Sequence, residues 1–245
     1  MIRAVLFDIG KTLVDDPFPK ARYAAGRFLV QKGLLEPSKL DAFHETLTLA
    51  NARIDSYQFS HFWGEEEIFT FALSSHGIHD DRLMKQTLAV YRQEVHRLYR
   101  TDPSLKALSN KELTSLLSWL QDEKGLILGI ISDERIASIA LYWDILECGD
   151  FFPLVVTSEE VGCRKPCERI FNHALEVAEV KAKESCYVGD NPIRDIAGAK
   201  GVGMISILFT KFCDHSSLVQ PDFTIDDLRE LRPIIDALSS SPYDG

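Results

Sequence analysis

Side chains suited to phosphoryl transfer occur at four places along this chain of 245 residues. Asp8 ends a short apolar run at the N-terminus, where a carboxylate can act as a nucleophile. Such a nucleophile divides phosphoryl transfer into two easier steps that are linked by an aspartyl-phosphate. Ser132 follows another apolar run and can donate a hydroxyl hydrogen to a phosphoryl oxygen, and Lys165 can supply a point charge. The fourth place holds the acidic pair Asp190 and Asp195.

The acidic residues among these predict a magnesium site. Carboxylate oxygens are hard ligands that suit Mg²⁺, which usually keeps several waters beside one or two carboxylates. A cation between Asp8 and Asp190 would also reduce the repulsion between these acids and a substrate phosphate. The sequence therefore predicts Mg²⁺ as the cofactor and a small phosphorylated molecule as the partner.

The elements that must position these residues follow an alternating pattern. Short apolar runs alternate with amphipathic segments of helical period, which is typical of a buried parallel sheet covered by helices on both faces. The strand ends of such a sheet converge on one crevice, so Asp8, Ser132 and Asp190 should meet there. We therefore predict an α/β, doubly wound, Rossmann-like fold. The expected strands are 2–7, 126–131, 154–157, 185–188 and 204–208, and the expected helices are 111–122, 135–146, 168–178, 193–200 and 227–238.

The segment between the first strand and the rest of the sheet is almost wholly helical by its apolar period. Four amphipathic patterns occupy it, and Gly33 and Gly77 stand where two of these helices should stop. We interpret the segment as a helical domain inserted into the sheet domain. The expected domains are a catalytic core of residues 1–16 and 104–245, a helical domain of residues 17–103, and a flexible tail of residues 239–245.

Composition and charge narrow the class of protein further. The formal net charge of −10 argues against general nucleic-acid binding, which needs a basic face. No apolar run approaches the ~20 residues that span a membrane, and Asp8 and Lys11 interrupt the N-terminal run, so we expect no signal peptide and a cytoplasmic location. The five cysteines are odd in number and scattered, which predicts reduced thiols rather than a disulfide framework. Cys163 and Cys167 lack a second cysteine pair and are interpreted as ordinary thiols rather than metal ligands.

Four motifs in chain order resemble those of the haloacid dehalogenase superfamily of hydrolases. The resemblance covers the whole core and implies a Rossmann-like sheet with a helical cap inserted after the first strand. It also implies that Asp8 is the nucleophile and that Ser132 and Lys165 are phosphate clamps. The motifs are Asp8-Ile-Gly-Lys-Thr12, Ser132, Lys165-Pro166, and Gly189-Asp190 followed by Asp195.

The same resemblance implies roles for the remaining motif residues. Thr12 would support the loop that carries the nucleophile. Asp190 and the backbone carbonyl of Gly10 would join Asp8 as Mg²⁺ ligands. Asp195 would be a supporting carboxylate, which contacts a metal-bound water or lies outside the ligands.

Gly10 keeps the backbone carbonyl but departs from the family pattern in its side chain. Phosphatases of this family carry a second aspartate there, which protonates the leaving alcohol and later activates water. Such proton transfer is worth about 10²–10⁴-fold in rate. Three interpretations follow. The substrate has a good leaving group, such as an acyl phosphate or an anhydride; or Lys11, Asp15 or a cap residue supplies the proton; or the chain has lost turnover and kept ligand binding.

The leading hypothesis is a Mg²⁺-dependent phosphohydrolase that acts on a small phosphorylated metabolite through Asp8, with weak ester hydrolysis because of Gly10. The alternative is a catalytically impaired binding or regulatory protein on the same fold. Two other chemistries rank lower. A dehalogenase needs no metal, so the pair Asp190 and Asp195 argues against it. A phosphonate hydrolase would need a Schiff-base lysine in the cap, for which the available residues are Lys20, Lys32, Lys39 and Lys85.

The helical insertion would select the substrate, but its side chains do not identify that substrate. Its polar candidates are better interpreted as solvated surface than as ligand contacts, and Trp63 is better interpreted as bundle core than as a stacking platform. The polar candidates are Lys20, Arg22, Arg53, His61 and His96.

Overall fold

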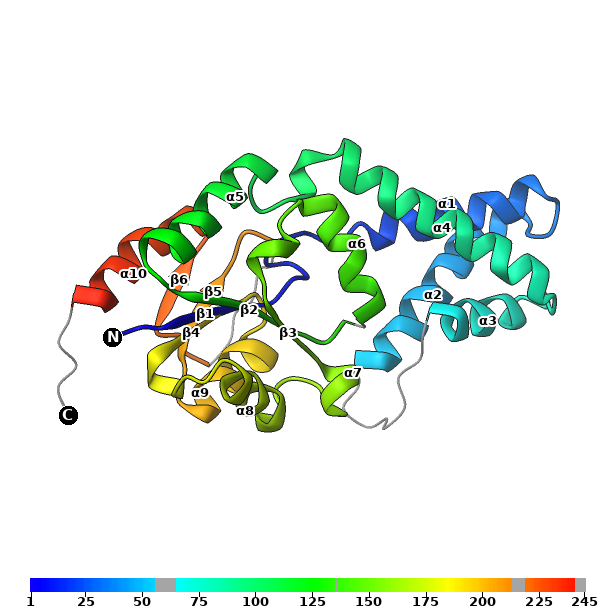
Figure 1. Cartoon of the computed structure of the whole chain (residues 1–245). Helices are drawn as coiled ribbons and strands as arrows, with labels where there is room; N and C mark the ends of the chain where they lie inside the picture. Colours follow the sequence, from blue (N-terminus) through cyan, green and yellow to red (C-terminus); the bar gives the residue numbers. More distant parts are fainter. Residues whose placement is uncertain (56–64, 135, 213–218, 241–245) are drawn as a thin grey trace. The chain divides into compact units, whose positions relative to one another are not determined.

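The structure of this protein is a computed structural model that describes residues 1–55, 65–134, 136–212 and 219–240. The chain forms two compact units (Figure 1). We call residues 1–15 with 103–245 the core unit and residues 16–102 the helical unit. His61 and Trp63 lie outside the described residues, as does the side chain of Arg53.

The core unit is built on a six-stranded parallel sheet with the strand order β3-β2-β1-β4-β5-β6. The order runs in opposite directions on the two sides of β1, which confirms the predicted doubly wound α/β fold. One edge strand, β6, was not predicted, because it has only three residues and one of them, Thr224, is exposed. The strands are β1 (Ala4–Phe7), β2 (Ile127–Ser132), β3 (Leu154–Thr157), β4 (Ser185–Gly189), β5 (Ile205–Phe209) and β6 (Phe223–Ile225).

The register of the sheet brings the ends of three strands to one edge. Strand β1 lies between β2 and β4, and all three run in the same direction. Asp8 continues β1 by one residue, and its backbone N–H donates to the Val188 carbonyl at 2.9 Å. Ser132 is the last residue of β2, and Asp190 directly follows β4. These three residues therefore leave the sheet at its carboxyl edge.

Helices cover both faces of the sheet (Figure 1). Helices α8 and α9 lie on one face, and α5 and α10 lie on the other. Phe171 of α8 meets Tyr187 of β4 edge-on, with ring centroids 5.2 Å apart, so the face under α8 is closely packed. The helices of the core unit are α5 (Asn110–Ser118), α6 (Ile136–Leu146), α7 (Ser158–Val161), α8 (Glu168–Val177), α9 (Gly198–Val202) and α10 (Leu231–Ser240), with π-helical segments at Trp119–Glu123 and Pro192–Ala197.

Helix α10 extends further than the sequence pattern predicts. We expected the helix to end at Leu238 and a flexible tail to begin at residue 239, but the helix continues to Ser240. The Ser240 hydroxyl donates to the Asp236 carbonyl at 2.7 Å, and this bond satisfies an acceptor in the last turn. Residues 241–245 of the expected tail lie outside the described residues.

Four helices form the helical unit, in which α1 and α3 each pack against both α2 and α4. Gly33 and Gly77 follow α1 and α3 with φ of +68° and +75°, which confirms them as helix stops. Asp80 caps α4, because its carboxylate accepts the backbone N–H of Leu83 at 3.0 Å. No helix within the described ranges is long and apolar enough to cross a membrane. The helices are α1 (Phe18–Gln31), α2 (Leu40–Asp55), α3 (Glu65–Ser75) and α4 (Asp81–Thr101).

The two chain segments that lead into and out of the helical unit pair with each other inside the core unit. The Asp15 N–H donates to the Leu105 carbonyl at 2.8 Å, and the Ala107 N–H donates to the Leu13 carbonyl at 2.9 Å. Val14 forms an antiparallel bridge with Lys106 between these two bonds. The insertion therefore begins and ends at neighbouring positions of the core unit.

Candidate active site

Lys165 is the centre of the candidate site. Its side chain is only 2% exposed, and its ammonium nitrogen lies 3.0 Å from Asp8 Oδ1 and 2.6 Å from Asp195 Oδ1. Burial alone lowers the pKa of an ammonium group, but the carboxylates of Asp195 and Asp8 reverse this effect and raise the pKa of Lys165 above its ordinary value. The lysine therefore carries a permanent positive charge beside the expected nucleophile.

Three buried carboxylates meet beside this lysine. Asp8, Asp190 and Asp195 each offer one oxygen, and these oxygens all lie within 4.8 Å of one another. Burial raises the pKa of Asp8 to about 8; Lys165 opposes this rise, and the charges of Asp195 and Asp190 add to it. A divalent cation would favour the ionised forms of all three acids. The set consists of hard oxygen donors within reach of one ion, which fits Mg²⁺.

Asp195 is held on both of its oxygens. Oδ1 accepts from the ammonium of Lys165, and Oδ2 accepts the backbone N–H of Asn191 at 2.9 Å. Gly189 provides the space for this carboxylate, because a Cβ at that position would lie 2.5 Å from the Cβ of Asp195. Asp195 itself lies in the π-helical segment after Asn191, whose wider turn carries it back toward the sheet edge. This geometry agrees with a supporting carboxylate that orients the lysine.

Ser132 and Thr12 contribute two buried hydroxyl groups. Ser132 Oγ accepts the backbone N–H of Glu134 at 3.1 Å, which leaves its hydroxyl hydrogen able to donate to a ligand. Thr12 lies on the loop that follows Asp8, and it is fully buried. Within the described part of the chain, Thr12 Oγ1 has no hydrogen-bond partner. A buried hydroxyl without a partner costs free energy, so this hydroxyl is a polar group that a ligand at the site could satisfy.

Two residues that the sequence patterns did not single out also position Lys165. The Tyr187 hydroxyl lies 3.0 Å from Lys165 Nζ and donates to the Ile131 carbonyl at 2.9 Å. Asp133 Oδ1 accepts the backbone N–H of Lys165 at 3.0 Å. Both residues carried a signal, because Tyr187 is a polar aromatic residue inside a buried strand and Asp133 directly follows Ser132. The contacts themselves join segments far apart in the sequence and could not be read from either signal.

Gly10 lies two residues beyond Asp8, and its surroundings would accept a side chain. The φ angle of Gly10 is not positive, so its backbone conformation suits any residue. A Cβ added at this position would meet no described atom within 4 Å. The neighbouring Lys11 adopts a left-handed conformation with φ of 56°, and its N–H donates to the Val14 carbonyl at 2.5 Å. The loop therefore leaves space for an acid beside the nucleophile but does not provide one at this position.

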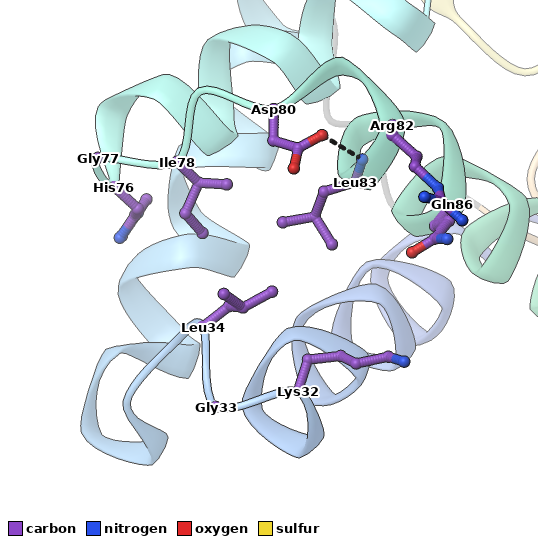
Figure 2. A pocket seen from close by; sticks show the side chains of 10 residues that line it. All are labelled: Lys32, Gly33, Leu34, His76, Gly77, Ile78, Asp80, Arg82, Leu83 and Gln86. Atoms are coloured by element: carbon purple, nitrogen blue, oxygen red, sulfur yellow. Dashed lines mark hydrogen bonds between the residues drawn. The ribbon is translucent and has the colours of Figure 1, made fainter.

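The helical unit contains a pocket of its own, which Figure 2 shows from close by. Leu34, Ile78 and Leu83 point toward its centre, and the bond from Asp80 to the Leu83 N–H lies at its rim. The pocket is lined by residues between 32 and 86, so none of the expected site residues belongs to it.

Comparison with known proteins places this chain within one family. Residues 36–209 match the model of the haloacid dehalogenase-like hydrolases. A glyceraldehyde 3-phosphate phosphatase from Methanocaldococcus jannaschii is 30% identical over 244 residues, which cover 96% of this chain and 97% of that protein. Another, from Methanothermobacter thermautotrophicus, is 32% identical over 252 residues, which cover 96% of this chain and 100% of that protein. The chain belongs to the haloacid dehalogenase-like hydrolase family, which confirms the family that its sequence was predicted to resemble.

Solved structures with the same fold include enzymes of different chemistry. A 2-haloacid dehalogenase from Pseudomonas syringae is 25% identical, with a TM-score of 0.69 and coverage of 98% of this chain and 100% of that chain. A phosphatase of the family from Thermococcus onnurineus is 26% identical, with a TM-score of 0.65 and coverage of 96% and 98%. A magnesium-bound hydrolase from Bacillus subtilis shares the fold at 20% identity, with a TM-score of 0.69 and coverage of 96% and 99%. Because one fold serves several reactions, the residues of the site must carry the functional argument.

Proposed function

We propose that this protein is a Mg²⁺-dependent phosphohydrolase that acts on a small phosphorylated metabolite through an aspartyl-phosphate at Asp8. The observation that carries the proposal is the buried cluster in which Lys165 contacts Asp8 beside Asp190 and Asp195. Relatives that are named phosphatases of glyceraldehyde 3-phosphate and of phosphoglycolate support this substrate class. A dehalogenase needs no metal, so the presence of three carboxylates within reach of one cation argues against that chemistry.

The residues of the chain divide the reaction into two steps. A carboxylate oxygen of Asp8 attacks the phosphorus, and the bond between phosphorus and the leaving oxygen breaks as the aspartyl-phosphate forms. Lys165 and Ser132 face the charge that develops on the phosphoryl oxygens and stabilise it. Water then attacks the phosphorus, the bond to Asp8 breaks, and phosphate leaves with the carboxylate restored. Asp195, Tyr187 and Asp133 keep Lys165 in place throughout.

The metal would be held by Asp8, by Asp190 and by the backbone carbonyl of Gly10. When bound, Mg²⁺ offsets the negative charge that two acids and a phosphate bring together. Both oxygens of Asp195 already have protein partners, so we assign it the supporting role rather than a place among these ligands. Thr12 completes the site as the buried hydroxyl on the nucleophile loop.

Gly10 determines which esters this site would hydrolyse well. The leaving oxygen needs a proton unless it is already a weak base, and position 10 provides no acid. An acyl phosphate or an anhydride should therefore form the aspartyl-phosphate faster than an alkyl phosphate ester does. This dependence on the leaving group distinguishes the site from the family pattern, in which the resemblance implies an aspartate at this position.

The test is release of inorganic phosphate by the purified chain with Mg²⁺ from a panel of phosphorylated metabolites that includes acyl phosphates, glyceraldehyde 3-phosphate and phosphoglycolate. We expect turnover that EDTA abolishes and Mg²⁺ restores. Asp8→Asn should remove it, because an amide oxygen is a poor nucleophile, whereas the exposed Asp236→Asn should leave it unchanged. Absence of phosphate release from every acyl phosphate in the panel would refute the proposal.

Gly10 also supports one alternative, a protein that binds a phosphorylated ligand without turning it over. Such a protein would bind Mg²⁺ and the phosphate mimic beryllium fluoride as the enzyme does, but it would release no phosphate. Calorimetry with the same panel separates the two functions. Saturable binding of a phosphorylated metabolite, without release of phosphate under the same conditions, would favour the binding protein.

A further inference from the structure

We propose that Cys163 and Cys167 are a site of reversible oxidation, and that a disulfide between them displaces Lys165 and stops turnover. The disulfide itself depends only on the two thiols. The loss of activity rests on the proposed function, in which Lys165 stabilises the charge on the phosphoryl group.

The two cysteines stand on either side of Lys165 in one tight turn. The backbone N–H of Cys167 donates to the Arg164 carbonyl at 2.9 Å, which folds the segment back on itself. The Cys163 and Cys167 side chains are close enough for each to shift the pKa of the other. Both side chains are only half-buried, so a small oxidant in solution can reach them. Lys165 between them is buried and directed into the acidic cluster.

The two thiols differ in reactivity, as an attacking thiol and its partner should. Burial tends to raise the pKa of Cys167, but the hydrogen bond from Cys163 and the groups of Arg169 lower it below the ordinary value for a thiol. Burial and the interaction with Cys167 raise the pKa of Cys163, and Arg169 only partly opposes this rise. Since the thiolate is the reactive form, Cys167 would be oxidised first. By contrast, burial raises the pKa of both Cys148 and Cys186 to about 12, so they should stay reduced.

The chemistry balances with a peroxide as the oxidant. The Cys167 thiolate attacks one peroxide oxygen, the O–O bond breaks, and after protonation the products are a sulfenic acid and water. The Cys163 sulfur then attacks the sulfenic sulfur, and a second water leaves as the disulfide forms. The two thiols lose two electrons and two protons in total, and the peroxide is reduced to two waters. A thiol such as dithiothreitol reverses the change by exchange through a mixed disulfide.

The disulfide must move the segment that carries Lys165. To form the disulfide, the two sulfur atoms must move from a non-bonded separation to a bond length of about 2.05 Å. This movement draws together the backbone on the two sides of Lys165. The lysine is held by contacts that tolerate little displacement, at 3.0 Å from its N–H to Asp133 and at 2.6 Å from its ammonium to Asp195. We therefore expect at least a tenfold loss of kcat/KM, because removing one such electrostatic donor costs about 10²–10³-fold.

The experiment follows both the bond and its effect in the full-length protein with Mg²⁺. The protein is treated with hydrogen peroxide and then digested with trypsin under non-reducing conditions. Trypsin cleaves after Arg164 and after Arg169 but not between Lys165 and Pro166, so only a disulfide keeps peptides 136–164 and 165–169 together. We expect this linked pair to appear in step with the loss of phosphatase activity, and dithiothreitol to reverse both.

Matched variants and a second measurement keep the test decisive. Cys163→Ser and Cys167→Ser should have normal activity and resist peroxide, whereas Cys213→Ser should respond like the natural chain. Hydrogen exchange at the Lys165 amide, which should accelerate in the disulfide form, decides the structural effect even if no substrate is turned over. The proposal is wrong if the linked pair does not form, or if it forms while activity and this exchange rate stay the same.

Discussion

Gly10→Asp should convert this protein into an efficient hydrolase of ordinary phosphate esters. The change restores an acid two residues after the nucleophile, where a side chain meets no described atom within 4 Å of its Cβ. The backbone at Gly10 does not have positive φ, so an aspartate fits there without backbone strain. General acid catalysis should raise kcat/KM for alkyl phosphates about 10²–10⁴-fold, which lowers the barrier to aspartyl-phosphate formation by about 3–5 kcal/mol.

The assay compares kcat/KM, which reports formation of the aspartyl-phosphate and not its later hydrolysis, for a series of phosphate esters of decreasing leaving-group acidity. The gain should be large for alkyl phosphates, whose leaving oxygen needs a proton, and small for p-nitrophenyl phosphate and acyl phosphates, whose leaving oxygen does not. Gly10→Asn is the matched control, since it adds the same volume without an acid and should give no such gain. Equal acceleration of every ester, or none in a folded Gly10→Asp protein that still binds Mg²⁺, would refute the reasoning.

Three further predictions concern the groups around Lys165. Tyr187→Phe should leave the Ile131 carbonyl without its donor, lowering the free energy of unfolding in urea by about 1–3 kcal/mol, and should reduce kcat/KM about tenfold or more through Lys165. Gly189→Ala should push Asp195 off the lysine, which should lower the free energy of unfolding in urea by about 1–3 kcal/mol and remove most of the activity. The control is Gly201→Ala in helix α9, where an added Cβ comes no closer than 3.8 Å to another residue, and it should change neither quantity. Because folding raises the pKa of Asp8 to about 8, its proton stabilises the metal-free fold at acid pH, and that contribution is lost as the pH rises through 8. Mg²⁺ should therefore bind more tightly and raise Tm more at pH 8 than at pH 5, and calorimetry should detect the released proton, which Asp8→Asn should abolish.

The sequence was sufficient to predict the sheet wherever a strand is a buried apolar run. Strand β3 has the predicted bounds, and β4 differs only by the added Gly189. Strand β6 was missed because an edge strand of three residues with an exposed Thr224 has no apolar run to detect. Helix α10 ends later than predicted because a hydroxyl bond in its last turn is not visible as periodicity.

The meeting of Asp8 and Asp190 at one edge could be predicted, because parallel strands end on the same side of a sheet. The position of Lys165 could not be predicted in the same way, because it belongs to a turn rather than to a strand end. Its place depends on Asp133, Tyr187 and Asp195, which are 22 to 32 residues away in sequence. A pattern in one sequence identifies the reactive residues more readily than the residues that hold them.

The paired segments at residues 13–15 and 105–107 make the helical unit a separable module. Backbone hydrogen bonds join the two segments that connect the helical unit to the core unit. A change in the length of the helical unit therefore changes the entropy of loop closure very little. Mutations and insertions in that module leave in place the contacts that hold Lys165, because Asp8, Asp133, Tyr187 and Asp195 all belong to the core unit. The helical unit can thus change in length and sequence while the core unit keeps the residues of the site.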